Sequence, residues 1–511
     1  MANLAKISSV SVEIRTANFA TLHEMKIRLA DMVILMGPNN SGKSTAAVIL
    51  YAACRAMPWR RGPAPGRAYF PLSINAHGGT AIGFDQRYLG KVSRELLKAI
   101  RNTRNSEDLK VSFPAGVRQL MKKPAVQLLE VYVRKLADEL ERCFGEDLKN
   151  LARSPSADGR TRVDVSHGDD WTVSFSFVRG RRPTFESSMT EISDDSWEDF
   201  LQRTFSSEQF WRLIQDIRSA AIDIDNIDEG DDETLSPRDM AYYLLESLFR
   251  RFSEYMFRHF PRNAHYLPAS RSGALQSHRA LAAAVVRQSS YVGIQDVAIP
   301  KLPGVVADFI SQLLELQPAA KGRYGSIAEV LQRDVLHGAI ELQPRTSMSP
   351  EIIFASNGAS HGLHRTSSMV SELAAIVLFL RHVVRLGDLL IIEEPESHLH
   401  PASQVVFAQT LARLVNANVR VAITTHSDYF INQLSNLIIQ HSIEGLGDSL
   451  SIKPQAVAAY LFSPTERSGT DVRELPVSDT EGISDEEFST VAEWLYNQNA
   501  LLTQESRASN A

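Results

Sequence analysis

Residues 37–45 read Gly37-Pro38-Asn39-Asn40-Ser41-Gly42-Lys43-Ser44-Thr45 and match the phosphate-binding pattern G-x-x-x-x-G-K-[ST]. An apolar run at 32–36 precedes the loop and predicts a buried strand, and 45–51 follows as a predicted helix. The glycines let backbone N–H groups converge on a phosphate at a helix N-terminus. We therefore expect phosphates to be bound by Asn39, Asn40, Ser41, Gly42, Lys43, Ser44 and Thr45, with Ser44 also ligating Mg²⁺.

The composition predicts a globular protein of more than one domain. The chain has 511 residues, 44% hydrophobic and 22% charged, which is too long for one compact core. A net charge of -6 excludes a protein that is basic throughout, although one part can still carry a basic face. Only 2 cysteines are present, which excludes a disulfide framework. With no signal-peptide core at the N-terminus, we expect a cytoplasmic protein.

Two later apolar runs end in residues that suit phosphate chemistry. Residues 389–392 are followed by Glu393, which can hold Mg²⁺ directly or through water, and by Glu394, which can polarise an attacking water. Residues 419–425 are followed by His426, which can hydrogen-bond a γ-phosphate. We therefore predict Mg²⁺-dependent ATP hydrolysis, with Ser44 and Glu393 serving the metal and Glu394 and His426 serving catalysis.

These motifs lie towards the two ends of the chain, and helical spacing predominates between them. A strand is also predicted there, at 172–177, where apolar and polar residues alternate. We expect three parts: the first half of an ATPase head at 1–57, a mainly helical insertion at 58–264, and the second half of the head at 265–511.

The order of these motifs resembles the ATP-binding-cassette-type heads of the SMC and RecF class. The block 393–401, together with 266–273 and 424–430, resembles more closely the prokaryotic overcoming-lysogenisation-defect-like ATPases of anti-phage systems such as Gabija, Septu and PARIS. The resemblance implies an α/β P-loop NTPase fold of the ABC/SMC head type, with ATP and Mg²⁺ as cofactors. It also implies at least a dimer, in which ATP is held between two heads.

The resemblance further implies a signature segment that reaches the partner's γ-phosphate. The usual Leu-Ser-Gly-Gly is absent, and the matching place is 364–370. There Ser367 and Ser368 begin a predicted helix, where they either bind an anion or cap the helix. Arg271 stands where a Gln-containing loop is expected, and we expect it to contact phosphate or the insertion. Residues 436–511 are too few for a Toprim nuclease domain, so a separate effector is expected.

Three features allow both a functional and a structural interpretation. His398 and His400 alternate with Glu396 and form either a metal site or a loop that faces a partner. The acidic run 223–233 is a metal cluster or a solvated loop. Arginines of the insertion, interleaved with aromatic residues, either follow a DNA backbone or lie on solvated helix faces above a core.

The function that these observations predict is the ATP-binding sensor or scaffold of an anti-phage system, acting with a separate nuclease or toxin. One alternative is an SMC/RecF-like repair or maintenance ATPase that acts on DNA directly. Another is a scaffold that binds ATP with little turnover. A transporter subunit is disfavoured, because the usual signature is missing.

Overall fold

A computed structural model describes residues 11–58, 86–102, 113–153, 160–168, 170–178, 181–189, 194–223, 237–289, 302–317, 322–343, 351–443, 450–465, 469–484, 494 and 496–503. The chain divides into two compact units. The first unit comprises Met1–Glu13, Arg55–Glu139 and Arg160–Phe260, and the second comprises Ile14–Cys54, Leu140–Gly159 and Pro261–Ala511. The insertion expected at 58–264 thus falls mostly in the first unit, but its stretch Leu140–Gly159 belongs to the second.

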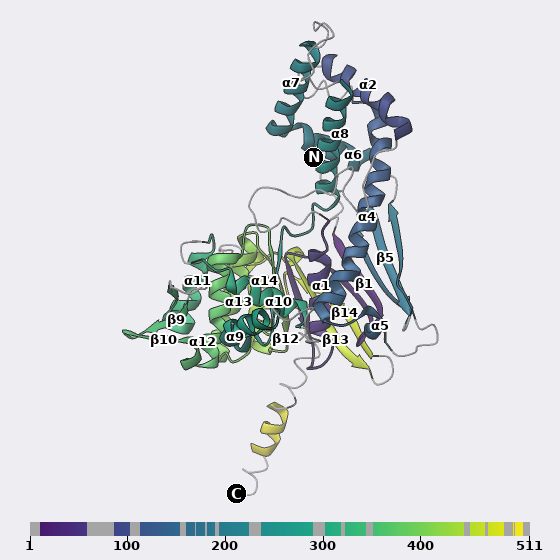
Figure 1. The fold of residues 1–511 in the computed structure, drawn as a ribbon. Coiled ribbons are helices and arrows are strands. Elements are labelled where there is room, and N and C mark those ends of the chain that lie inside the picture. Colours follow the sequence, from purple (N-terminus) through teal and green to yellow (C-terminus); the bar gives the residue numbers. More distant parts are fainter. Residues whose placement is uncertain are drawn as a thin grey trace. The chain divides into compact units, whose positions relative to one another are not determined.

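The second unit is organised around a sheet whose central strands are parallel (Figure 1). Along the sheet the order is β1 (Val12–Phe19), β2 (Leu22–Arg28), β14 (Gly469–Leu475), β13 (Val457–Thr465), β3 (Met32–Met36), β12 (Arg420–Thr425), β11 (Leu389–Glu393) and β7 (Ala264–Leu267). Strands β3, β11 and β7 are buried at every position, as expected where both faces of a parallel sheet are covered. The strands predicted before the phosphate loop and before Glu393 and His426 are therefore confirmed.

The register brings the carboxyl ends of four neighbouring strands to one edge of the sheet. Thr425 at the end of β12 pairs with Met36 at the end of β3. Glu393 at the end of β11 pairs with Thr424, and Leu267 at the end of β7 pairs with Ile392. Ligands of open parallel sheets bind outside such strand ends. Residues that are hundreds of positions apart in sequence are thereby assembled at one edge.

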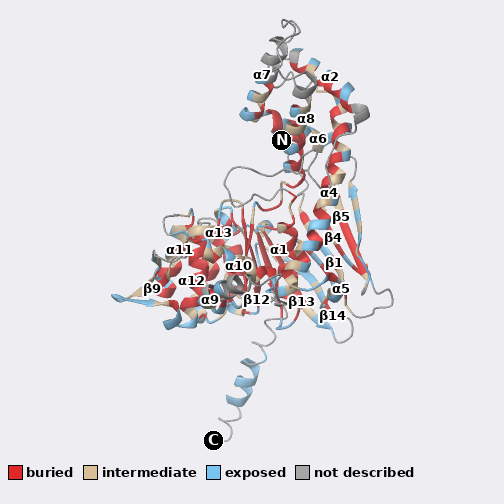
Figure 2. Cartoon of the chain, in the orientation of Figure 1, coloured by how far each residue is buried: buried red, intermediate tan, exposed pale blue. Residues whose placement is uncertain are grey.

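Helices with apolar faces complete the core of the second unit, whose buried residues are shown in red in Figure 2. These helices are α1 (Lys43–Arg55), α9 (Arg271–Ser289), α10 (Gly304–Leu314), α11 (Gly325–Leu331), α12 (Ser368–Leu378), α13 (Pro401–Asn416) and α14 (Asp428–Ser442). Three short antiparallel strands, β8 (Ala339–Gln343), β9 (Glu351–Ser356) and β10 (Ala359–Gly362), form a separate sheet. Helix α12 is buried from Val370 to Leu378, so it packs within the core along most of its length.

The first unit combines helices with an antiparallel sheet. Its helices include α2 (Gln86–Asn102), the first part of α4 (Ala115–Phe144), α6 (Asp194–Phe205), α7 (Glu208–Asp223) and α8 (Pro237–Met256). The strand predicted at 172–177 is confirmed as β5 (Trp171–Val178), and it lies between β4 (Arg160–His167) and β6 (Thr184–Met189). Trp171 is buried against Tyr132, Phe257 and Phe260, and its Nε1 donates to the Met256 carbonyl at 3.0 Å.

The aromatic residues that alternate with arginines in the first unit belong to its core. Phe252, Tyr255 and Phe257 are buried. Arg258 lies 3.9 Å from the centre of the Tyr255 ring and pairs with Asp170 at 3.4 Å. The arginines at 60, 61 and 179 and nearly all of the acidic run fall outside the described residues. In the described residues the aromatic side chains therefore belong to the core, as the structural interpretation predicts, but Arg258 is not a solvated arginine, because its side chain is only 14% exposed.

Among the helices that the structure describes, none combines the length and the apolar composition that a membrane span requires.

Candidate active site

The phosphate loop joins β3 to α1 and requires its two glycines. Gly37 has φ +145° and Gly42 has φ +89°, values that side chains rarely permit. A Cβ at Gly37 would lie 2.5 Å from the Phe462 carbonyl oxygen, and one at Gly42 would lie 2.7 Å from Thr21 Oγ1. Asn40 also adopts a positive φ of 62°, which Asn tolerates better than most residues. The loop therefore has the curled backbone that phosphate binding needs.

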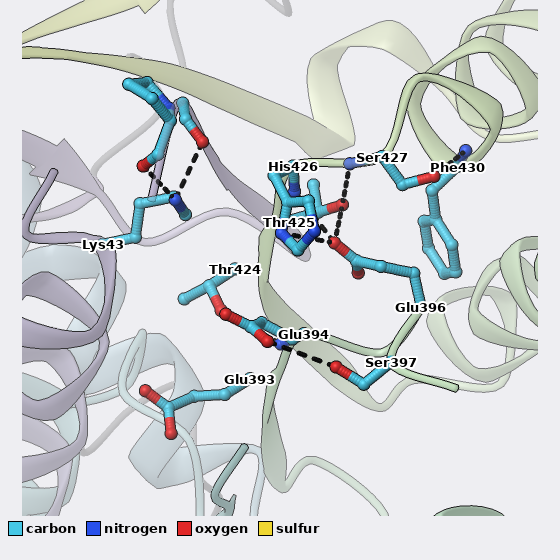
Figure 3. Close-up of polar contacts among 12 residues, drawn as sticks. Lys43, Glu393, Glu394, Glu396, Ser397, Thr424, Thr425, His426, Ser427 and Phe430 are labelled. Atoms are coloured by element: carbon cyan, nitrogen blue, oxygen red, sulfur yellow. Dashed lines mark hydrogen bonds and ion pairs between the residues drawn. The ribbon is translucent and has the colours of Figure 1, made fainter. Parts of the chain in front are cut away.

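Lys43 closes across this loop from the first residue of α1. Its Nζ donates to the carbonyl oxygens of Gly37 at 2.8 Å and Pro38 at 2.6 Å. Burial lowers the pKa of Lys43, while the carboxylates of Glu394 and Glu396 act in the opposite direction. The Lys43 ammonium thus interacts electrostatically with both carboxylates (Figure 3).

The other predicted loop residues differ in their exposure. Asn39, Asn40 and Ser44 are exposed, whereas Ser41 is buried, and Ser41 Oγ has no hydrogen-bond partner among the described residues. A buried hydroxyl without a partner in a loop of this shape fits a site whose remaining hydrogen bonds come from a ligand. The loop therefore fits a nucleotide phosphate.

Glu394, the predicted catalytic acid, follows β11 in a strained backbone conformation. Its φ is 42°, which is uncommon for a residue with a Cβ and costs about 1–2 kcal/mol. Its N–H donates to the Thr424 carbonyl at 3.0 Å and lies 3.1 Å from Thr424 Oγ1. Its Oε2 accepts from Ser397 Oγ at 3.2 Å (Figure 3). Strain that the surroundings hold in place is characteristic of functional sites.

Glu393, the predicted metal residue, is buried at the end of β11. Its Oε2 accepts from the Ala269 N–H at 2.9 Å. A carboxylate and the Ser44 hydroxyl are hard oxygen donors, the type of ligand that Mg²⁺ takes together with phosphate oxygens and water. The two residues therefore fit Mg²⁺ by their chemistry.

His426, which follows β12, is oriented by Glu396. Oε1 of Glu396 accepts from the His426 N–H and from Thr425 Oγ1, both at 2.8 Å, and lies 3.3 Å from His426 Nδ1 (Figure 3). Glu396 is buried, whereas the His426 side chain is 42% exposed. With Nδ1 facing the carboxylate, Nε2 is the ring nitrogen that can meet a phosphate.

The alternating residues Glu396, His398 and His400 do not form a metal site. Glu396 faces inward, while both histidines are exposed. His400 instead caps α13, with its Nδ1 accepting from the Ala402 N–H at 3.3 Å. No group of three or more His, Cys, Asp or Glu side chains that could hold a metal occurs in the described residues.

Ser367 and Ser368 lie at the exposed start of α12. Ser367 is the N-cap of the helix, and its Oγ accepts from the Val370 N–H at 3.4 Å. Ser367 therefore caps α12, which is one of the two roles that the sequence allows. Anion binding by the two serines stays a prediction.

Arg271 lies behind the two acids, and the contacts that the structure shows for it are with neither a phosphate-loop residue nor the insertion. The side chain is 0% exposed, and its guanidinium donates to the carbonyls of Glu393 at 2.6 Å and Glu394 at 3.1 Å. Arg271 follows β7, which neighbours β11, so its side chain reaches behind the two acids. Sequence reasoning missed this contact because the partners are 122 and 123 residues away.

Part of this unit is similar to a known family of ATPase domains. Residues 288–431 match the family described as AAA ATPase domain, a range that includes Glu393, Glu394 and His426. No curated protein matches. The predicted α/β fold is confirmed by the central parallel strands and by the phosphate loop that joins β3 to α1.

Solved structures similar to this chain include three SMC heads. One is an SMC head bound to the C-winged helix domain of ScpA. Its identity is 10%, the match covers 92% of this chain and 98% of the SMC head, and the TM-score is 0.38. Another is the SMC head domain from Thermotoga maritima, with 10% identity, coverage of 92% and 100% and a TM-score of 0.35. A third is an Smc head with an extended coiled coil, bound to the C-terminal domain of ScpA derived from Pyrococcus furiosus, with 10% identity, coverage of 95% and 99% and a TM-score of 0.35.

Proposed function

We propose that this chain is a Mg²⁺-dependent ATP hydrolase. The observation that carries the proposal is the meeting of the phosphate loop, Glu393, Glu394 and the Glu396–His426 pair at one edge of a parallel sheet. Bound Mg²⁺ would neutralise charge on the phosphate oxygens. Every other role falls to side chains and backbone groups of this chain.

Each group has a distinct role in this proposal. The loop N–H groups and Lys43 bind the phosphates, and Ser44 and Glu393 hold the metal. Glu394 orients the attacking water and accepts its proton, and its backbone contacts with Thr424 and Arg271 keep the carboxylate in place. His426 donates a hydrogen bond to the γ-phosphate, with Glu396 holding the ring.

We also propose that ATP is shared between two copies of the chain. Phosphoryl transfer develops charge on the γ-phosphate, and fixed donors on all sides of that group stabilise it most. The start of α12 is exposed. The first N–H groups of a helix have no partner within the helix, and although Ser367 caps the N–H of Val370, this start can face a phosphate bound by a second copy. A dimer is the smallest assembly in which each site has both parts.

The biological role that we propose is that of the ATP-dependent sensor or scaffold of an anti-phage system, with a separate nuclease or toxin as effector. The motif resemblance at 393–401 supports this role. Cys54 and Cys143 are buried and form no disulfide, which supports a reducing compartment, the cytoplasm. Direct action on DNA is less well supported, because the described aromatics near the arginines lie in the core.

The test of the activity is ATP turnover by the purified full chain across a Mg²⁺ titration, with and without DNA. We expect Mg²⁺-dependent hydrolysis that Lys43→Ala abolishes. ATP binding without turnover would support the scaffold alternative, and turnover that requires DNA would support the repair alternative. For the biological role, cells that carry the chain and its neighbouring genes should resist phage, and Glu394→Gln should remove that resistance.

A further inference from the structure

A fully buried ion pair lies directly behind the two acids of the candidate site. Arg271 is 0% exposed and Glu372, on α12, is 2% exposed. Arg271 Nε and Glu372 Oε2 are 2.7 Å apart, a close ion pair without the alignment of a hydrogen bond. The same guanidinium donates through Nη1 to the carbonyls of Pro268 at 3.3 Å and Glu393 at 2.6 Å, and through Nη2 to Glu394 at 3.1 Å.

Stability alone does not explain this pair. Burying two charges is costly, and an apolar pair of similar volume is often at least as stable. What an apolar pair cannot provide is the geometry of the guanidinium, which is planar and donates in several fixed directions at once. Here the guanidinium points to the backbone carbonyls of Glu393 and Glu394, and to Glu372 on α12.

The contact with Glu394 acts on a strained backbone. Glu394 has a φ of 42° and is held on one side by Thr424 and on the other by Arg271. Without Arg271, the backbone of Glu394 can relax towards a commoner conformation, and a carboxylate that moves by a fraction of an ångström loses its alignment.

The pair also joins the acids to the helix that begins at Ser367. Glu372 lies in the first turns of α12, whose start is exposed. A second contact ties the same helix to the element that carries Arg271, because Gln276 Nε2 donates to Ser371 Oγ at 3.1 Å. Any displacement of α12 therefore reaches the carbonyl of Glu394 through a chain of direct contacts.

We propose that Arg271, paired with Glu372, is a positioning residue that holds Glu394 in its hydrolytic conformation and makes that conformation depend on the position of α12. This proposal rests on the ATPase function proposed above. It assigns to Arg271 an effect on the chemical step, transmitted through Glu394, and none on nucleotide binding.

The experiment compares kcat, nucleotide affinity and melting temperature in two variants. Arg271→Lys keeps the buried charge but cannot reach three partners in different directions. Arg271→Met/Glu372→Leu removes both charges and leaves neither unpaired. For each we expect kcat to fall at least about tenfold, with the Kd for ATP within about twofold of that of the original chain.

The matched control breaks a buried polar pair at the other end of the same strands. His265 in β7 contacts Asp388, just before β11, with Nε2 and Oδ2 3.0 Å apart, and both residues are buried. His265→Gln should lower the melting temperature and leave kcat unchanged. A fall of kcat in the control that matches its loss of stability would overturn the proposal, because any destabilisation of these strands would then suffice.

The remaining outcomes are also decisive. An Arg271 variant that folds and hydrolyses ATP at the original rate would contradict the proposal. So would failure of both Arg271 variants to fold while His265→Gln folds, because the pair would then serve the fold. If the unaltered chain binds ATP without hydrolysing it, the proposed ATPase function is refuted, and with it the role of Arg271. The melting temperatures distinguish this outcome from a failure to fold.

Discussion

The end of β11 and the start of α12 are built in contrasting ways, although the proposed reaction needs both. At the end of β11, Glu393 is buried, and Glu394 is held in a strained conformation by contacts from β12 and from Arg271, the first residue of α9. At the start of α12, Ser367 and Ser368 are exposed, and Ser367 makes a capping contact of 3.4 Å.

This contrast indicates which half of the site the chain completes by itself. Buried polar groups with several partners are positioned by the fold of one copy. An exposed helix start with its first N–H groups available gains partners from whatever approaches it. The strand ends should therefore act within one chain, and the start of α12 should act on a second chain.

The largest effect is expected from Glu394→Gln. The amide keeps the shape of the side chain and can still accept from Ser397, but it cannot accept a proton, so kcat should fall by about 10²–10⁴-fold. ATP affinity should persist, and ATP-bound dimers should accumulate, as measured by turnover, equilibrium binding and light scattering. Hydrolysis at the original rate would show that Glu394 is not the base, and Glu393 or Glu396 would then be the candidates.

Mixing two inactive variants tests whether the start of α12 acts on a second chain. Lys43→Ala lacks a working loop, and Ser367→Ala/Ser368→Ala lacks a working helix start. In a mixed dimer, one of the two sites combines an intact loop with an intact helix start, so part of the activity should return. Heterodimers that demonstrably form and yet stay as inactive as either variant alone would refute the shared site.

A smaller effect is expected when Glu393 is changed. Glu393→Asp should remain active, because Asp offers the same oxygen donors, and it is the commoner residue at this position in the proteins that the motif resembles. Glu393→Ala removes the carboxylate that Ala269 binds and should raise the Mg²⁺ requirement by about tenfold or more. Identical Mg²⁺ titrations for all three proteins would remove Glu393 from the metal site.

The sequence predicted the strand ends well because they depend on local patterns. Each apolar run has polar residues immediately after it, and parallel strands bring such ends together. Thus the positions of the phosphate loop, Glu393, Glu394 and His426 at one edge of a sheet were predictable from the chain alone. The strand β5 was predictable for the same reason, because alternation at period two is a local signal.

The roles of Arg271 and Glu396 were not predictable, because they depend on contacts between distant segments. Arg271 meets Glu372 about a hundred positions along the chain, and nothing near Arg271 in sequence indicates an acidic partner. In sequence, Glu396 stands beside His398 and His400, which suggests a shared site. The backbone turns at His398, with φ 61°, and Glu396 faces inward to His426, 30 residues away.

The smallest effect separates the capping role of Ser367 from its proposed role towards a second chain. Replacement of an N-cap Ser by Ala costs about 1 kcal/mol, whereas Gly at the same position costs only a few tenths. Ser367→Ala should therefore lower the melting temperature by about 1–2 °C for each kcal/mol lost, because the second unit is large, and Ser367→Gly should barely change it. Both variants remove the hydroxyl, so both should reduce hydrolysis in the dimer to the same extent if the hydroxyl contacts the partner's nucleotide. Melting temperature and turnover measured on the same samples decide the matter. If turnover is reduced in Ser367→Ala but not in Ser367→Gly, the hydroxyl only stabilises the helix and does not contact the partner's nucleotide. The end of β11 and the start of α12 would then differ in stability, and not in whether they act on the same chain or on a second one.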